Sequence, residues 1–218
     1  MEERSKNGKK RPEMNTEFDA VIVANGEFPT HEIPLAILKS AKHIVACDGA
    51  IKNVPQAEVV VGDGDSVPQA YHDRLIKIEE QEDNDLTKAT RYCLSMKWHK
   101  IAYIGCTGKR EDHTLGNIGL LMRYFRKMGV EGMMFTDYGF FTPACGNQTF
   151  QSKKGQQVSI FNFGCKQLTS EGLKWKSYAH KEWWQGTLNE SLAKHFSIQA
   201  DSYYLVYQTY EAKWERSR

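Results

Sequence analysis

The sequence predicts an α/β protein in which an N-terminal domain with a mostly parallel sheet precedes a smaller C-terminal antiparallel β domain. Up to about residue 137, short apolar segments alternate with segments of helical periodicity, which is typical of a parallel sheet covered on both faces. From residue 138 onward, short segments of alternating polarity are separated by turns rich in Gly, Asn and Lys, which favours antiparallel strands. We therefore divide the 218 residues into a disordered tail (1–16), an α/β domain (17–137) and an antiparallel β domain (138–218).

The strands of the first domain are expected where short apolar runs end at turn-forming residues. The first run, FDAVIVA, ends at Asn25-Gly26, and the second, HIVAC, ends at Asp48-Gly49. The expected strands are residues 18–24, 43–47, 58–61, 75–78, 100–104 and 131–137.

Helices are expected between these strands, at residues 34–42, 85–96 and 112–128. The last is the clearest, because helical spacing places five apolar side chains on one face and Gly129 follows as a helix stop. That face consists of Leu115, Ile118, Leu121, Met122 and Phe125. In the second domain, strands are expected at residues 158–163, 172–175, 195–200 and 203–210.

Charge and cysteine content exclude several classes of protein. The net charge is +2, but residues 1–11 carry five basic and two acidic side chains, so the remainder is slightly acidic and we expect no nucleic acid partner. The five cysteines show no C-x-x-C spacing, which argues against a disulfide framework or a zinc site. No segment approaches the ~20 apolar residues of a membrane span, and the polar first residues do not resemble a signal peptide. We expect no membrane partner and a cytoplasmic location.

Carboxylates follow the predicted strands at the edge of the sheet where ligands of parallel α/β proteins bind. Asp48 follows one strand, Asp63 and Asp65 follow the next, and Asp85 opens a helix. Residues two apart in an extended chain face the same way, so Asp63 and Asp65 can converge on one cation. Magnesium is commonly held by one or two carboxylates together with substrate phosphates. The pattern indicates a site for a metal and a polyphosphate, although Asp and Gly also form ordinary turns and helix caps.

The phosphate-binding motifs in common use are absent. Thr107-Gly108-Lys109-Arg110 lacks both the first Gly of a P-loop and its Ser or Thr after the Lys, so phosphate would bind at the start of the helix at Asp112. A rival interpretation is that VVVGDGDSV is the D-x-D nucleophile motif of haloacid-dehalogenase-type phosphohydrolases. Two strands precede it here, whereas those enzymes usually place it after the first strand.

Five blocks in order resemble the thiamin pyrophosphokinase (thiamin diphosphokinase) family. They are residues 46–50 (ACDGA), 62–66 (GDGDS), 81–89 (QEDNDLTKA), 108–117 (GKREDHTLGN), and 172–175 (GLKW) followed by Asn189-Glu190. The resemblance implies an α/β domain, a β-sandwich and a homodimer with the thiamin site at the subunit interface. It also implies that Mg²⁺, ATP and thiamin give thiamin diphosphate and AMP. Phosphoryl-type transfer suits these residues, because it needs positioning and charge neutralisation more than covalent chemistry by the protein.

The resemblance also implies roles for individual residues. Asp63, Asp65 and Asp85 match magnesium-binding acids, and Asp48 matches a catalytic acid at the diphosphate end that can accept the hydroxyl proton. The implied ATP-binding residues are Gln81, Lys88, Gly108, Arg110, Asp112 and His113, and the implied thiamin-binding residues are Asn189 and Trp175.

Some positions leave alternatives open. Lys88 could simply pair with Asp85 one helical turn before it, His113 could serve only the start of its helix, and Asn25 could be only a turn residue. Asn84, Glu111 and residues 186–188 depart from the family's usual Thr, aromatic residue and Ser-rich stretch. A non-catalytic module that binds thiamin or a nucleotide is a further alternative.

Overall fold

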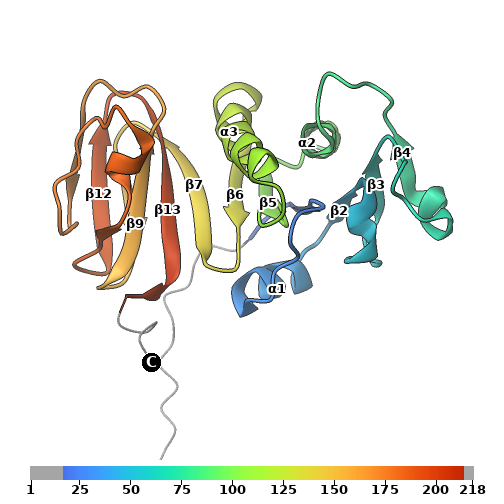
Figure 1. The fold of residues 1–218 in the computed structure, drawn as a ribbon, viewed down its shortest axis with the longest axis horizontal. Helices are drawn as coiled ribbons and strands as arrows, with labels where there is room; N and C mark the ends of the chain where they lie inside the picture. Colours follow the sequence, from blue (N-terminus) through green and yellow to red (C-terminus); the bar gives the residue numbers. More distant parts are fainter. Residues whose placement is uncertain (1–16, 214–218) are drawn as a thin grey trace, which may run out of the picture.

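The computed structural model describes residues 17–213 and is built around one long mixed sheet (Figure 1). Its ten strands lie in the order β11-β9-β13-β7-β6-β5-β1-β2-β3-β4, and a second sheet has the order β10-β12-β8. The first six strands of the chain are β1 (Ala20–Val23), β2 (Ile44–Cys47), β3 (Val59–Gly62), β4 (Leu75–Lys77), β5 (Lys100–Ile104) and β6 (Glu131–Phe135). They pair in parallel, as predicted.

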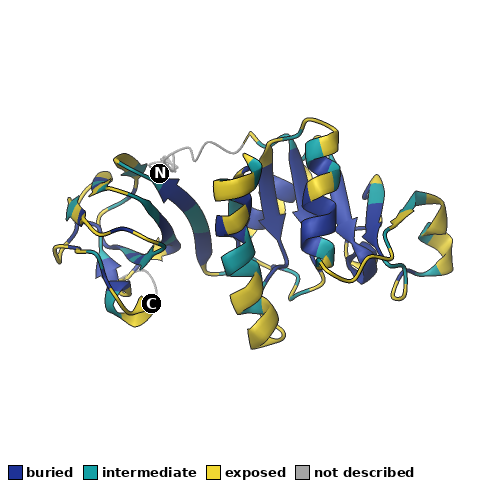
Figure 2. Ribbon diagram, turned by 90° about the horizontal axis from the view of Figure 1, so that it is seen from above, coloured by how far each residue is buried: buried dark blue, intermediate teal, exposed yellow. Residues whose placement is uncertain are grey.

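Helices cover both faces of this parallel part. The α-helices are α1 (Glu32–Lys39), α2 (Asp85–Ser95) and α3 (Glu111–Met128), and the 3-10 helices are η1 (Asp48–Lys52), η2 (Gln69–Arg74) and η3 (Trp183–Gly186). In Figure 1, α2 and α3 lie above the sheet and α1 lies below it. The strands are buried while the outer helix surfaces are exposed (Figure 2).

Alternation along β1 explains how one strand serves two cores. Ala20 and Ile22 belong to the cluster that includes Leu121 of α3, whereas Val21 and Val23 face the cluster that includes Ile37 of α1. Successive side chains of a strand point to opposite faces, so a strand buried on both sides must be apolar throughout. This is why the continuous apolar runs predicted the strands correctly.

The sandwich continues the same sheet. Strand β7 (Gly139–Cys145) pairs antiparallel with β6, with Phe140 opposite Phe135, and pairs on its other side with β13 (Tyr203–Ala212). Strands β9 (Gln156–Asn162) and β11 (Asn189–Glu190) complete this side. The facing sheet contains β8 (Gln148–Gln151), β10 (Leu168–Glu171) and β12 (His195–Ala200). Because one sheet runs through both halves, the division after Asp137 remains a proposal, based on the change from parallel to antiparallel pairing.

Three expectations about elements were wrong. Residues 172–175 do not form a strand, because β10 ends at Glu171 and only Leu173 bridges to Ser191. Leu115 does not join the core but is 58% exposed, whereas the other four residues of the expected face pack in the core cluster. Strands β7, β8, β10 and β11 were missed, and the expected tail (1–16) lies outside the described residues. The helix stop at Gly129 is confirmed by its left-handed φ of 68°.

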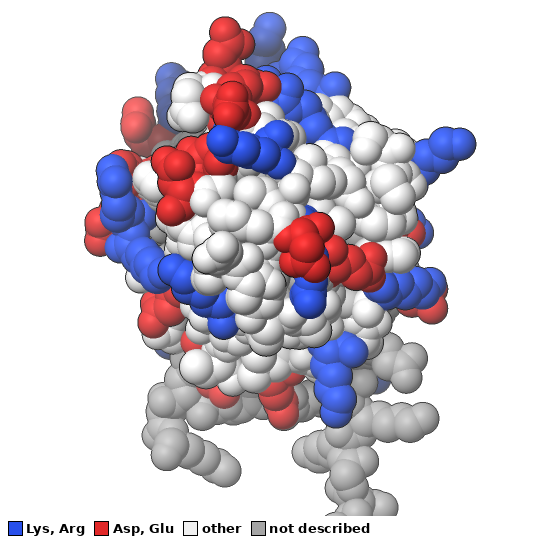
Figure 3. Space-filling view, turned by 90° about the vertical axis from the view of Figure 1, so that its right-hand side faces the viewer, with Lys and Arg blue, Asp and Glu red and all other residues white. Residues whose placement is uncertain are grey.

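The surface at the β4 end of the molecule carries acidic and basic side chains side by side, with uncharged surface between them (Figure 3). None of the helices in the described part of the chain is both long and apolar enough to span a lipid bilayer.

Candidate functional site

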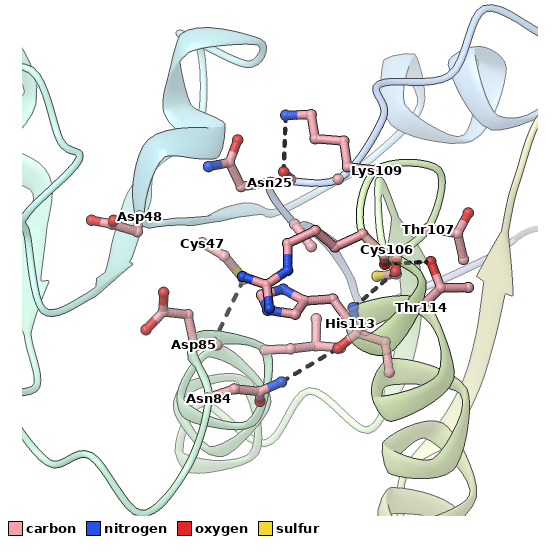
Figure 4. A pocket seen from close by; sticks show the side chains of 15 residues that line it. Asn25, Cys47, Asp48, Asn84, Asp85, Cys106, Thr107, Lys109, His113 and Thr114 are labelled. Atoms are coloured by element: carbon pink, nitrogen blue, oxygen red, sulfur yellow. Dashed lines mark hydrogen bonds between the residues drawn. The ribbon is translucent and has the colours of Figure 1, made fainter.

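A pocket of about 380 Å³ lies at the carboxyl ends of β1, β2 and β5 and the first turns of α2 and α3 (Figure 4). This is the edge at which ligands of open parallel sheets bind. The lining residues are Ala24, Asn25, Gly26, Cys47, Asp48, Asn84, Asp85, Leu86, Cys106, Thr107, Lys109, Arg110, His113, Thr114 and Asn117. Four of the predicted site residues are among them: Asp48, Asp85, Arg110 and His113.

Asp48 occupies an unusual position at the start of η1. Its φ of 41° lies in the left-handed region, which a non-glycine residue rarely adopts, and its side chain rests against Gly62, where a Cβ would lie 2.9 Å from the Asp48 Cβ. Asp48 is 8% exposed, and Oδ2 accepts a hydrogen bond from the Ser66 N–H at 3.3 Å. Oδ1 is buried and has no hydrogen-bond partner among the described residues. A buried acceptor of this kind is costly, which fits a site that receives a cation or a donor from a ligand.

Asp85 is the first residue of α2, and the helix is capped by Asn84, whose side chain accepts a hydrogen bond from the Thr87 N–H at 3.0 Å. Burial raises the pKa of Asp85, and the negative charges of Asp48 and Asp63 add to this, while the Lys88 ammonium opposes them. The charges of Asp48 and Asp63 thus act on Asp85, and a cation bound at this edge would relieve the repulsion among the three carboxylates.

Asp63 and Asp65 follow β3, as predicted, but neither lines the pocket. The Asp65 N–H donates to Oδ1 of Asp63 at 3.1 Å. Among residues 17–213, no three His, Cys, Asp or Glu side chains are close enough together to hold a metal ion. Even so, the edge gathers acids and includes an unpartnered buried oxygen of Asp48, so its donors fit a hard divalent cation. The metal assignment of Asp63, Asp65 and Asp85 stays a prediction.

The opposite side of the pocket is basic. Arg110 precedes α3 and donates to both carboxylate oxygens of Asp112, at 3.1 and 2.6 Å, while Lys109 donates to the Asn25 carbonyl at 3.1 Å. Gly108 lies in the same loop with a left-handed φ of 92°. In Figure 4, Asp48 and Asp85 lie on the side of the pocket away from Thr107 and Thr114. An anion bound at the start of α3 would therefore face carboxylates across the pocket, an arrangement suited to a metal-bound phosphate.

Of the six predicted ATP-binding residues only Arg110 and His113 line the pocket; Gly108 and Asp112 lie next to them in the chain, and Gln81 and Lys88 lie elsewhere. The exposed Gln81 donates to the Glu79 carbonyl at 3.2 Å and does not line the pocket. Lys88 is 2% exposed, and its ammonium lies 3.5 Å from Oδ1 of Asp85 and 3.1 Å from the Ile78 carbonyl. The alternative that Lys88 pairs with Asp85 along the helix is confirmed.

The predicted thiamin residues lie in the β half, away from the pocket lining. Asn189 is buried, and its amide is occupied: Oδ1 accepts from the Trp175 N–H at 3.1 Å and Nδ2 donates to the Trp175 carbonyl at 2.7 Å. Asn189 therefore fixes the backbone of Trp175, whose ring is 52% exposed under the Lys174 ammonium. Of the two, Trp175 offers the free surface.

Several lining residues were not among the predicted site residues. From the sequence, Asn25 could be only a turn residue, and the uncharged Cys106 and Asn117 show no pattern that indicates a site. Asn117 donates to the Cys106 carbonyl at 2.8 Å and accepts from Asn84 at 3.3 Å, so it ties α3 to the start of α2. The sequence feature that could have identified Asn117 as a site residue is its position at the end of the block GKREDHTLGN.

Comparison with known proteins gives the same family in both halves of the chain. Residues 35–131 match the family model described as thiamin pyrophosphokinase, catalytic domain, and residues 139–207 match the model described as thiamin pyrophosphokinase, substrate-binding domain. The two matches together span most of the chain. No curated protein gives a significant match.

Solved structures share the fold at low sequence identity. The thiamine pyrophosphokinase from Bacillus subtilis has a TM-score of 0.69 and 19% identity, covering 88% of this chain and 99% of that one. The thiamin pyrophosphokinase from Candida albicans has a TM-score of 0.72 and 15% identity, covering 88% and 90%. The yeast thiamin pyrophosphokinase has a TM-score of 0.70 and 13% identity, covering 91% and 88%.

These findings also decide between the two enzymatic alternatives. The model that matches the half containing Asp63 is the catalytic domain of a pyrophosphokinase, which argues against the haloacid-dehalogenase-type interpretation. The strand order, the acidic and basic sides of the pocket and both family models lead to one conclusion: the chain belongs to the thiamin pyrophosphokinase family of transferases.

Proposed function

We propose that this protein transfers the diphosphate group of ATP to the hydroxyl of thiamin, giving thiamin diphosphate and AMP, with Mg²⁺ as the metal. The observation that carries the proposal is the Asp48 carboxylate, which is buried, held in a left-handed backbone and left with one unpartnered oxygen in the pocket. Backbone strain and an unsatisfied buried acceptor both lower the stability of the fold, and such features concentrate at functional sites.

The chemistry assigns each side of the pocket a task. The thiamin hydroxyl oxygen forms a bond to the β-phosphorus, the bond between that phosphorus and the oxygen bridging to the α-phosphate breaks, and AMP leaves with this oxygen and its electron pair. Asp48 accepts the hydroxyl proton, while Lys109 and Arg110 balance phosphate charge from the start of α3. Magnesium, held at the acidic edge, would neutralise charge on the transferred group.

We further propose that thiamin is held by the β half, at the interface of a homodimer. Large aromatic side chains are exposed between residues 175 and 184, namely Trp175, Tyr178, Trp183 and Trp184, and none of them lines the pocket. An aromatic face attracts a cation and stacks on a flat ring, and thiamin has both features. The carboxylates of the pocket suit a metal and phosphates but not a pyrimidine ring.

The direct test is product analysis. The protein is incubated with ATP, Mg²⁺ and thiamin, and AMP and thiamin diphosphate are measured, with reactions lacking thiamin or containing EDTA as controls. We expect the two products in equal amounts and neither in the controls. Release of inorganic phosphate without AMP would indicate a phosphohydrolase, and ligand binding without turnover would indicate a non-catalytic module. Either result would overturn the proposal.

A further inference from the structure

The side chain of Asn25 is not used by the fold. Asn25 follows β1 and lines the pocket, and its amide makes no hydrogen bond within the described residues 17–213. An asparagine that serves a turn commonly bonds the backbone two residues on, and this one does not. Asn25 is exposed at the pocket, so its amide is free to bind a ligand there.

The backbone around Asn25 is held firmly from both sides. The Ala24 N–H donates to the Ile104 carbonyl at 2.8 Å, and the Gly26 N–H donates to the Gly105 carbonyl at 2.7 Å. The approach at Gly26 is so close that a Cβ there would lie 2.3 Å from the Gly105 oxygen. The Lys109 ammonium binds the carbonyl of Asn25 itself at 3.1 Å. The backbone position from which the Asn25 side chain extends is consequently fixed before any ligand arrives, which lowers the cost of binding.

Gly49, which has no side chain, leaves space for the side-chain amide of Asn25. A Cβ on Gly49 would lie 3.0 Å from Nδ2 of Asn25, so the amide lies against the residue that follows Asp48. In Figure 4 the Asn25 side chain lies between Asp48 and Lys109. It is a neutral group between the acidic and basic sides of the pocket.

We propose that Asn25 is a substrate-binding residue that donates a hydrogen bond from Nδ2 to a phosphate oxygen of ATP; this rests on the proposed function. Phosphate oxygens accept hydrogen bonds and do not donate them, so the amide offers its NH₂ group. A carboxylate in the same place would repel the phosphates and add to the charge of Asp48. An amide avoids both effects while keeping the size and shape of the side chain.

The test is calorimetric binding of α,β-methylene-ATP, which cannot be cleaved at the bond the proposed reaction breaks. The wild-type protein is compared with Asn25→Asp, Asn25→Ala and Asn53→Asp. Asn53 is an exposed residue at the end of η1 that does not line the pocket, so its variant is matched for added charge. We expect Asn25→Asp and Asn25→Ala each to raise Kd by about tenfold or more, with Asn53→Asp unchanged. Melting temperatures should stay the same, and adenosine, which lacks phosphate, should bind all four proteins equally.

Four other outcomes of this experiment would overturn the inference. Asn25 variants that bind α,β-methylene-ATP within twofold of wild type would overturn the inference, and the proposed function would stand if the wild type still makes AMP. An equal loss in Asn53→Asp would show a general charge effect and overturn the inference. An equal loss with adenosine would show that the contact is not to phosphate. A wild-type protein that binds no nucleotide would overturn the inference and the proposed function together.

Discussion

Asp48 shows how a single residue couples the fold to the proposed chemistry. Its left-handed backbone and its contact with Gly62 direct the carboxylate to the junction of β2 and β3, and only one of its oxygens has a partner in the described chain. The position of Asp48 after a strand could be predicted from sequence, because turn signals end apolar runs. Its backbone strain could not, because strain depends on what packs around the residue.

The neighbouring acids provide a test of the metal assignment. Asp63→Asn should lower turnover by about 10²–10³, because the substitution removes a charge that balances the metal and phosphates. The fold should persist, since the asparagine oxygen can still accept from the Asp65 N–H. Asp73→Asn, an exposed acid of η2 outside the pocket, is the matched control. Steady-state assays with melting curves check this, and turnover of Asp63→Asn within twofold of wild type would remove Asp63 from the metal site.

The cysteines make a second residue-scale prediction. Burial raises the pKa of the Cys93 thiol to about 12 and also raises the pKa values of Cys47 and Cys106 well above the ordinary value, although Cys47 and Cys106 line the pocket. The thiolate is the reactive form, so these thiols should be inert at neutral pH. Cys145 alone of the five is partly exposed. Titration with a disulfide reagent should find about one reactive thiol in the native protein and all five after denaturation. Fast loss of three or more native thiols would contradict the described burial.

The sequence predicted where a residue lies when local position decides it, but it could not predict side-chain contacts that depend on packing. Asp48 and Asp85 were expected in the pocket because both begin segments at the carboxyl edge of the sheet. Asn189 was expected to face thiamin, yet its amide is bound to the backbone of Trp175, fourteen residues away. No pattern in the sequence distinguishes an amide that contacts the backbone from one that contacts a ligand. Asn25 was missed for the same reason.

At the scale of elements, the start of α1 depends on a residue from the distant turn between β6 and β7. Asp137 accepts hydrogen bonds from the Thr30 N–H at 2.7 Å, the His31 N–H at 2.9 Å and the Thr30 hydroxyl at 3.0 Å. Burial raises the pKa of Asp137, but the hydrogen bonds from His31 and Thr30 outweigh it and hold the pKa below the ordinary value of 3.8. The turn thus anchors α1 next to the point where the sheet changes to antiparallel pairing.

Removing this carboxylate should destabilise the protein in a pH-dependent way. Asp137→Ala should lower the free energy of unfolding at pH 7 by about 1 kcal/mol, the usual cost of losing a helix-start acceptor. A carboxyl with a lowered pKa stabilises the fold above its ordinary value and loses this effect as the pH falls through the folded value. The difference from wild type should therefore shrink as the pH falls below 3.8. Urea unfolding at several pH values measures it, and Asp137→Asn, which keeps one acceptor, should show a smaller loss.

The elements themselves were predicted well where burial is two-sided and less well where it is one-sided. Strands β1, β2, β3, β5 and β6 are short apolar runs because both faces are covered, whereas β4 lies at the edge of the sheet and is partly exposed. Strand β10, with the sequence LTSE, has one face exposed, and it was not predicted. The neighbouring segment GLKW was predicted instead, but it contains Gly172 with a φ of 79° and forms only a bridge. Alternation over four residues is too short a signal to fix a strand.

At the scale of the whole molecule, the proposed ATP site and the proposed thiamin surface lie in different parts of one subunit. The pocket is lined only by residues from the first half of the chain, whereas Trp175 and Trp184 project from the β half, 52% and 72% exposed. In Figure 1 the β-sandwich lies at one end of the long axis and β4 at the other. A second copy of the chain offers a way to bring the two surfaces together, and it would cover the exposed aromatic side chains.

Complementation between two inactive variants tests this arrangement. Asp63→Asn damages the acidic edge, and Trp175→Ala damages the aromatic surface, so each homodimer should have low activity. If every site takes one surface from each subunit, a mixed dimer has one site with both lesions and one with none. Randomly mixed subunits should then recover about a quarter of wild-type activity, because half of the dimers are mixed and each of those has one intact site of two.

The measurement needs subunits that exchange, which is achieved by co-expressing the variants with different affinity tags and purifying the doubly tagged species. That species should carry about half of wild-type activity, since one of its two sites is intact. Light scattering should give about twice the 25.0 kDa of one chain for the wild type and for both variants. A doubly tagged dimer no more active than the variants alone would place each complete site within one subunit. A monomeric wild type that is fully active would overturn the shared site altogether, because one chain would then bring the pocket and the aromatic surface together without a partner.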